Sequence, residues 1–276
     1  MTIKNIVFSG GALKGWAYIG TIRALNEYST LRNQLENVAG VSIGSIFGLL
    51  YLLNIPWEYL LDKIMNLNFL DMIDINLDIL LNTNSLILGK NFKEYVCELM
   101  SLKVDPEITF KKLYSSCNIK FTTCAINLSI GKFEYFNYLL TPDIKVIDAV
   151  MASASLPLLF PAYSINGNYY YDGGFINNCP VNLFDPLETI GFDLFTNKSI
   201  KKNNIARLIE ILLTNINNFH VDKSIYENIY VVIVDKYSNH EFNINQSRDD
   251  IFNIYMHGYI LSKEILHRDF YSLPWN

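Results

Sequence analysis

Two glycine-flanked turns near the N-terminus carry residues that together could perform an acyl transfer. Ser42 lies in a G-x-S-x-G pentapeptide between Gly40 and Gly44, and a glycine-rich segment with Gly10 and Gly11 precedes it. A G-x-S-x-G turn between a strand and a helix exposes a nucleophilic hydroxyl, and a glycine-rich turn before a helix presents N–H groups to a developing oxyanion. The order of the two segments predicts a serine nucleophile with an oxyanion hole upstream.

The glycine-rich segment at residues 10–15 differs from the common nucleotide-binding patterns. The P-loop spacing G-x-x-x-x-G-K-[ST] is absent, because Trp16 follows Gly15. Ala12 stands where the dinucleotide pattern G-x-G-x-x-G has its second glycine. Lys14 adds a cation that could face an oxyanion or a phosphate group, or lie in water in the first helical turn. We therefore expect an anion cradle at a helix N-terminus rather than a nucleotide site.

The segment of Asp172, Gly173 and Gly174 contains a carboxylate that is a candidate general base. After an aromatic, strand-like stretch, these residues also fit an ordinary hairpin turn. A carboxylate within hydrogen-bond reach of a serine can accept its proton, and a glycine pair permits a close approach. Residues 151–161 combine small side chains with two prolines, which predicts close packing beneath an active site.

The expected secondary structure places these segments at the junctions of an α/β fold. Residues 3–8 predict a buried strand and residues 15–31 a helix, and a short segment before Ser42 leads into a helix that stops before Pro56. This order predicts a mostly parallel sheet, which binds ligands where strands give way to helices. The other expected elements are a helical, apolar segment at 57–100, a hairpin of strands 121–127 and 132–138, a helix at 147–155, a central strand at 229–234 and a closing helix at 249–268 that buries Ile251, Ile254, Tyr255 and Leu261.

Composition excludes several classes of protein. The 276 residues are 50% hydrophobic and 18% charged, with a net charge of −5, which predicts a globular chain and disfavours nucleic acid as a partner. The cysteines lack the C-x-x-C spacing of zinc sites, so we expect no metal and no cofactor. Reduced or core thiols suit a cytoplasmic protein. The four cysteines are Cys97, Cys117, Cys124 and Cys179.

The sequence predicts no signal peptide and no transmembrane segment. The N-terminus lacks a long apolar region, and the most apolar run, residues 46–53, is far shorter than the roughly 20 residues of a spanning helix. Residues 69–73 and 271–275 combine apolar and interfacial side chains. They could dock peripherally on a membrane or belong to the core.

The ordered motifs resemble those of the patatin-like phospholipase family. The resemblance rests on residues 9–15, residues 40–44, an Ala-Ser-x-x-x-Pro stretch at 154–162 and residues 172–180, and it extends over about 3–181. It implies a three-layer α/β/α fold with a mostly parallel central sheet. The economical interpretation is a single domain over 1–276, in which residues 182–276 complete the fold.

The resemblance also implies an activity, because members of the family hydrolyse acyl lipids with a Ser–Asp dyad and without histidine. It implies Ser42 as the nucleophile and Asp172 as the general base, acting on a phospholipid or another acyl lipid. Whether a protein activator is needed stays open. The implied oxyanion hole consists of the N–H groups of Gly10, Gly11 and Ala12 with Lys14 beside them, and the supporting motif positions are Gly15, Gly40, Gly44, Gly173 and Gly174.

Two positions depart from the family pattern. Ala12 replaces a glycine, so a positive φ at this position would strain the backbone. Lys14 replaces an arginine that many members carry, which keeps the charge and loses bidentate contacts.

Two alternatives stay open. The chain order Ser…Asp…His of α/β-hydrolases would make the protein a Ser-His-Asp esterase or acyltransferase, although those enzymes place several strands before the serine. The candidate histidines for such a triad are His220, His240, His257 and His267. The second alternative is a weakly active lipid-binding protein with the same fold.

Overall fold

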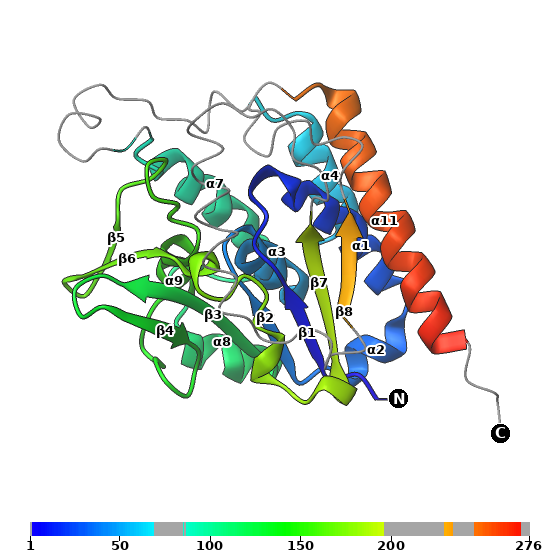
Figure 1. Ribbon diagram of the computed structural model, residues 1–276, viewed down its shortest axis with the longest axis horizontal. Helices are drawn as coiled ribbons and strands as arrows, with labels where there is room; N and C mark the ends of the chain where they lie inside the picture. Colours follow the sequence, from blue (N-terminus) through cyan, green and yellow to red (C-terminus); the bar gives the residue numbers. More distant parts are fainter. Residues whose placement is uncertain (1, 69–84, 86, 196–228, 234–245, 272–276) are drawn as a thin grey trace.

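The computed structural model describes residues 2–68, 85, 87–195, 229–233 and 246–271. Its centre is a sheet of eight strands in the order β5-β6-β3-β2-β1-β7-β8, with β4 paired to β3 (Figure 1). The strands are β1 (Asn5–Phe8), β2 (Asn37–Gly40), β3 (Lys120–Asn127), β4 (Lys132–Phe136), β5 (Tyr163–Ile165), β6 (Asn168–Asp172), β7 (Thr189–Phe195) and β8 (Ile229–Ile233).

Helices connect most of these strands, as the sequence predicts. The α-helices are α1 (Ala17–Asn26), α2 (Ser29–Gln34), α3 (Ile43–Leu52), α4 (Trp57–Met65), α7 (Lys90–Met100), α8 (Phe110–Cys117), α9 (Val146–Ser153) and α11 (Arg248–Tyr271). The short 3₁₀ helices are η1 (Ala12–Trp16), η2 (Gly173–Phe175), η3 (Val181–Leu183) and η4 (Pro186–Glu188).

The sheet is mostly parallel, which confirms the predicted α/β class. Strands β3, β2, β1, β7 and β8 run parallel to their neighbours in that series. The far end of β3 pairs antiparallel with β4, which confirms the predicted hairpin, and with β6, which carries Asp172. The antiparallel pairing of β3 with β6 therefore places Asp172 on the side of β3 opposite to the parallel strand β2, which leads to Ser42.

The two faces of the sheet are covered differently. Ile6 and Phe8 of β1 point into the main core, to which the described α-helices contribute. Val7 points to the other face, where it packs against Cys179 and Val181. Among the described residues, the segment after Asp172 is thus what covers β1 and β2 on the face opposite the helices.

Helices α1 and α11 lie side by side although they are far apart in the sequence (Figure 1). A Cβ at Gly20 would lie 2.1 Å from Tyr255 O, and a Cβ at Gly258 would lie 2.1 Å from Ala17 O. Side chains of any size at Gly20 and Gly258 would therefore force the helices apart. The predicted closing helix is confirmed, with Ile254 and Tyr255 buried.

Several predictions on other elements need correction or fall outside the described residues. The expected helix at 15–31 is divided into η1, α1 and the start of α2. The predicted strand at 229–234 is confirmed as β8, but it lies at the end of the described strand order and not in its centre, with α11 packed against it. A covering helix lets a strand at the end of a sheet be as apolar as a central one. Leu261 is half-buried, while Ile251 is buried as expected.

The two segments considered for membrane docking, residues 69–73 and 271–275, lie outside the described residues except for Tyr271 at the end of α11. Within the described ranges, no helix combines the length and apolarity needed to cross a membrane.

Candidate active site

Ser42 lies on a sharp turn between β2 and α3. It is the residue before α3 and has a φ of 54°, in the left-handed region that a non-glycine residue rarely adopts. A Cβ at Gly40 would lie 2.2 Å from Gly44 O, and a Cβ at Gly44 would lie 2.3 Å from Ser9 O. Both glycines are therefore required for strand and helix to approach this closely, as the G-x-S-x-G spacing predicts.

The small-residue segment at 151–161 supports this turn from below. The Ser42 N–H donates to Ser153 Oγ at 3.0 Å, and Ser45 Oγ donates to Ser42 O at 2.6 Å. Farther along the same segment, Ser155 O accepts the N–H of Asp172 at 2.9 Å. The predicted packing beneath the site is confirmed, and it includes hydrogen bonds to both Ser42 and Asp172.

Asp172 is almost fully buried, with 1% of its surface exposed. Its Oδ1 accepts the Gly174 N–H at 2.7 Å, while its Oδ2 is buried and has no hydrogen-bond partner in the described part of the chain. Burial raises the pKa of Asp172 to about 7, and the Ser42 side chain and the Gly174 N–H oppose this rise. The effect of the Ser42 side chain on this pKa indicates that the Ser42 and Asp172 side chains are neighbours.

The glycine-rich loop lies directly against Ser42. A Cβ at Gly10 would be 3.1 Å from Ser42 Cβ. Gly10 is joined to Asn178 by two hydrogen bonds, from Gly10 N–H to Asn178 O at 3.0 Å and from Asn178 Nδ2 to Gly10 O at 3.2 Å. Because the Gly10 N–H is engaged within the protein, the N–H groups of Gly11 and Ala12 are those that stay candidates for an oxyanion hole.

Two observations on this loop test expectations from the sequence. Ala12 has a φ of 48°, which confirms that the alanine occupies a strained left-handed conformation. Lys14 is buried, with 6% of its surface exposed, so the alternative of a lysine in water is wrong. Its Nζ lies 3.5 Å from Leu194 O, near the end of β7. A role of the Lys14 charge at an oxyanion stays a prediction.

Buried hydrogen bonds fix the start of the loop to the sheet. Ser9 Oγ accepts the Leu194 N–H at 2.9 Å and lies 3.1 Å from the Tyr18 hydroxyl. The Tyr18 hydroxyl also lies 2.9 Å from the carbonyl oxygens of Ser9 and Phe192. Ser9 and Asn178 belong to the motifs noted in the sequence, but their hydrogen bonds to Leu194 and Gly10 were not predicted, because these partners lie on distant parts of the chain. Sequence reasoning did not identify Tyr18 as a supporting residue.

The described residues offer no histidine to Asp172. Neither Asp172 oxygen has a histidine partner within the described ranges. His257 and His267 lie on α11, and His220 and His240 lie outside the described residues. In the same ranges, no group of three or more histidine, cysteine, aspartate or glutamate side chains could hold a metal ion.

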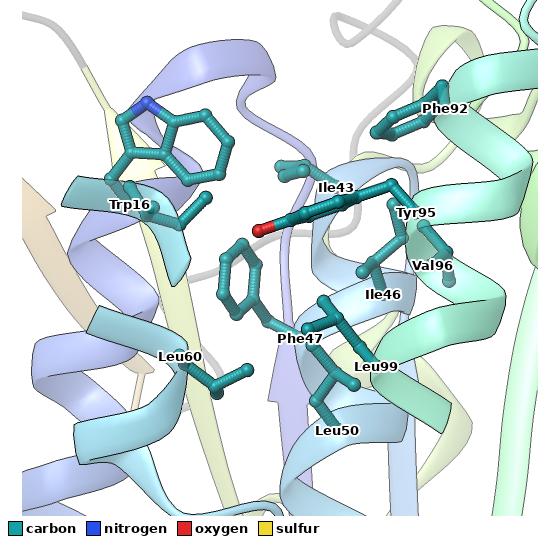
Figure 2. A pocket seen from close by; sticks show the side chains of 11 residues that line it. Trp16, Ile43, Ile46, Phe47, Leu50, Leu60, Phe92, Tyr95, Val96 and Leu99 are labelled. Atoms are coloured by element: carbon teal, nitrogen blue, oxygen red, sulfur yellow. The ribbon is translucent and has the colours of Figure 1, made fainter. Parts of the chain in front are cut away.

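An apolar pocket is lined in part by residues adjacent in sequence to Ser42 and to the glycine-rich loop. Ile43, the residue after Ser42, and Trp16, the residue after Gly15, form part of its wall (Figure 2). The enclosed part of the pocket measures about 20 Å³, and the value rises to about 380 Å³ only when the open solvent at its mouth is counted. The remaining lining residues come from α3, α4 and α7 and are Ile46, Phe47, Leu50, Leu60, Ile64, Phe92, Tyr95, Val96 and Leu99.

Comparison with known proteins relates the chain to one family and to several individual proteins. Residues 6–185 match the patatin-like phospholipase family. A probable lipid hydrolase (463L) of Invertebrate iridescent virus 6 is 31% identical over 189 residues, which cover 65% of this chain and 62% of that protein. The lysophospholipase NTE1 of Candida albicans is 25% identical over 180 residues, which cover 64% of this chain and 12% of that much longer protein.

Solved structures share the fold at low sequence identity. VipD from Legionella pneumophila aligns over 96% of this chain and 67% of its own, with a TM-score of 0.58 and 15% identity. The type III effector protein ExoU aligns over 97% of this chain and 53% of its own, with a TM-score of 0.57 and 14% identity. Because the family match spans more than half of the sequence, including Ser42 and Asp172, the chain belongs to the patatin-like phospholipase family.

Proposed function

We propose that the protein hydrolyses fatty-acyl esters of phospholipids or lysophospholipids through a Ser42–Asp172 dyad. The observation that carries the proposal is the buried Asp172 carboxylate, whose pKa the Ser42 side chain lowers and whose Oδ2 has no hydrogen-bond partner among the described residues. A pKa of about 7 suits a general base that must accept a proton and return it near neutral pH.

The proposed reaction has two halves. Ser42 Oγ attacks the ester carbonyl while Asp172 accepts its proton, and the N–H groups of Gly11 and Ala12 stabilise the oxyanion. The proton then passes to the departing alcohol, which leaves an acyl group on Ser42. In the second half, Asp172 takes a proton from a water molecule, whose oxygen attacks the acyl carbon. The bond from this carbon to Ser42 Oγ then breaks, the fatty acid leaves, and Asp172 returns the proton to Ser42 Oγ.

Two observations support a lipid as the substrate. The pocket beside Ile43 is apolar and suits a hydrocarbon chain. The similar proteins 463L and NTE1 are named as a probable lipid hydrolase and a lysophospholipase. We extend the proposal to peripheral contact with a membrane, where such lipids reside, and to the reducing cytoplasm, which suits the free thiols of the four cysteines.

The proposal is tested by mass spectrometry of the products from a mixed phospholipid pool. Ser42→Ala and Asp172→Asn should each abolish the release of fatty acid, and a fluorophosphonate probe should label the wild type but not Ser42→Ala. Ser101→Ala, at an exposed serine after α7, is the matched control and should keep full activity. Full activity in either dyad variant would refute the mechanism.

A further inference from the structure

The pocket beside Ser42 is lined almost entirely by carbon. None of the described residues that line it has a charged side chain. Two lining residues have polar atoms, and one of these, Trp16 Nε1, donates to Gln246 Oε1 at 3.1 Å. The other is the hydroxyl of Tyr95 on α7, which points between Trp16 and Phe47 into the pocket (Figure 2). A single hydroxyl is therefore the polar feature that the pocket offers to a ligand.

The Tyr95 hydroxyl oxygen is buried and has no hydrogen-bond partner among the residues that the structure describes. A buried polar group without a partner costs free energy, so its presence calls for an explanation such as a ligand that satisfies it. Burial raises the pKa of Tyr95, and Glu98 and Tyr59 act in the same direction, so the hydroxyl keeps its proton and can donate.

The pocket also has the right position for the acyl part of a substrate. Ile43, the residue after Ser42, is part of its lining, and Ile46, Phe47 and Leu50 of α3 continue the wall. An acyl chain bound to Ser42 would enter at Ile43 and meet these side chains in order. The absence of charge in the lining excludes a chain with an ionised substituent, because nothing there would compensate its desolvation.

We propose that this pocket takes the substrate's acyl chain and that the Tyr95 hydroxyl selects a chain carrying an uncharged oxygen, such as a hydroxyl or keto group. The inference rests on the proposed function and adds the substrate class to it. An unsubstituted chain fills the same space but leaves the Tyr95 hydroxyl unpaired. An oxygenated chain gains a hydrogen bond in a dry environment, where its own oxygen would otherwise lose its contact with water.

The test compares lysophosphatidylcholines that carry a stearoyl chain or one of a series of monohydroxystearoyl chains with the hydroxyl at different positions. In the wild type, at least one hydroxyl position should raise kcat/KM by about 5- to 10-fold over stearoyl. Tyr95→Phe should abolish this preference and leave the stearoyl rate within about 2-fold of the wild type.

Tyr51→Phe is the matched control. The Tyr51 hydroxyl is also buried without a partner, yet Tyr51 lies outside the pocket lining. This variant should keep the full preference for the hydroxylated chain. A wild type that prefers no hydroxyl position, or a preference that survives Tyr95→Phe, would overturn the inference.

Failure of the proposed function is recognised separately, because it would abolish hydrolysis of the stearoyl ester as well. Binding of the same lipids to Ser42→Ala, measured by displacement of a fluorescent fatty acid, gives the comparison without turnover. The hydroxylated lipid should bind to Ser42→Ala about 5- to 10-fold more tightly than the stearoyl lipid does. When Tyr95→Phe is added to Ser42→Ala, the two lipids should bind equally. Equal binding in Ser42→Ala alone would refute the selection by Tyr95.

Discussion

Gly10 and Asn178 exchange two hydrogen bonds across 168 residues of sequence, one from each residue to the other. This pair joins the glycine-rich loop to the segment that follows Asp172. The same segment approaches Asn178 again at Gly174, where a Cβ would lie 2.8 Å from Asn178 Oδ1. Asn178 therefore sets the distance between the proposed oxyanion hole and the proposed base.

Asn178→Ala should lower kcat/KM for ester hydrolysis by about 10- to 100-fold, because small displacements of reacting groups carry large kinetic costs. The side chain removed here donates to Gly10 O and lies beside Gly174. Initial rates on a short-chain ester and on a lysophospholipid measure the effect, and circular dichroism shows whether the fold is retained.

Asn177→Ala provides the comparison for this substitution. Asn177 Nδ2 donates to Asn182 Oδ1 at 2.8 Å and to the Tyr135 hydroxyl at 3.3 Å, away from the glycine loop. Its loss should change kcat/KM by less than about 3-fold, the size of one modest hydrogen bond. Equal losses in the two variants would show that Asn178 has no special positioning role.

The pH dependence of activity should follow Asp172. Its pKa is raised to about 7 by burial, and it can act as a base only when ionised. We expect kcat/KM to rise with pH and to reach half of its plateau near pH 7. A rate that is flat between pH 5 and 8, measured with a neutral substrate across that range of roughly three units around the pKa, would contradict Asp172 as the base.

The free energy of unfolding should also depend on the ionisation of Asp172, but it should fall as the pH rises, whereas activity should increase. The pKa of Asp172 is higher in the folded protein than its ordinary value of 3.8, so the folded state binds the proton more tightly than the unfolded state. Stability from this group is full at low pH and falls as the pH rises from about 4 to about 7. The neighbouring Cys124 stays neutral there, because burial raises the pKa of its thiol well above the usual value.

Asp172→Asn removes this titration. Urea unfolding at a series of pH values should show a smaller loss of stability between about pH 4 and pH 7 in Asp172→Asn than in the wild type. Parallel curves for the two proteins would mean that the carboxylate does not titrate abnormally.

Local sequence patterns sufficed to predict much of the fold, because β1, α3, β3 and α9 depend mainly on apolar periodicity and on helix-stop signals nearby. The position of β8 could not be predicted in this way. Its place beside β7 depends on pairing between distant segments, and its composition does not distinguish a central strand from one covered by a helix. The docking of α11 on α1 likewise depends on Gly20 and Gly258, which carry no local signal for each other.

The candidate site likewise contains residues that local motifs predict and contacts that depend on distant segments. Ser42 and Asp172 stand in recognisable local motifs, so both could be proposed from the sequence. Ser153 is 111 residues from Ser42, and the hydrogen bond between them exists only because α9 is packed beneath the turn. The engaged N–H of Gly10 could not be foreseen either, since its partner Asn178 is brought there by the sheet.

Gly44→Ala should prevent the turn that carries Ser42 from folding. The added Cβ would lie 2.3 Å from Ser9 O and 2.4 Å from Phe8 O, and backbone atoms cannot rotate away. We expect a loss of about 3 kcal/mol or more in unfolding free energy, at the upper end for overpacking. Gly167→Ala is the control, because its Cβ meets nothing within 4 Å, and its φ of 81° limits the cost to about 1–2 kcal/mol.

Ala12→Gly should stabilise the protein while keeping its activity. A left-handed conformation costs an alanine about 1–2 kcal/mol, and glycine adopts it without that cost but loses about 0.5–1 kcal/mol through its more flexible unfolded chain. With a φ of 48° at Ala12, the net gain should be about 0.5–1 kcal/mol in urea unfolding. Ala17→Gly, where φ is −60° at the start of α1, should instead destabilise the protein by about 1 kcal/mol. If both substitutions destabilise equally, the loop around Ala12 is not strained. Since the N–H of residue 12 is retained, kcat/KM of Ala12→Gly should match that of the wild type.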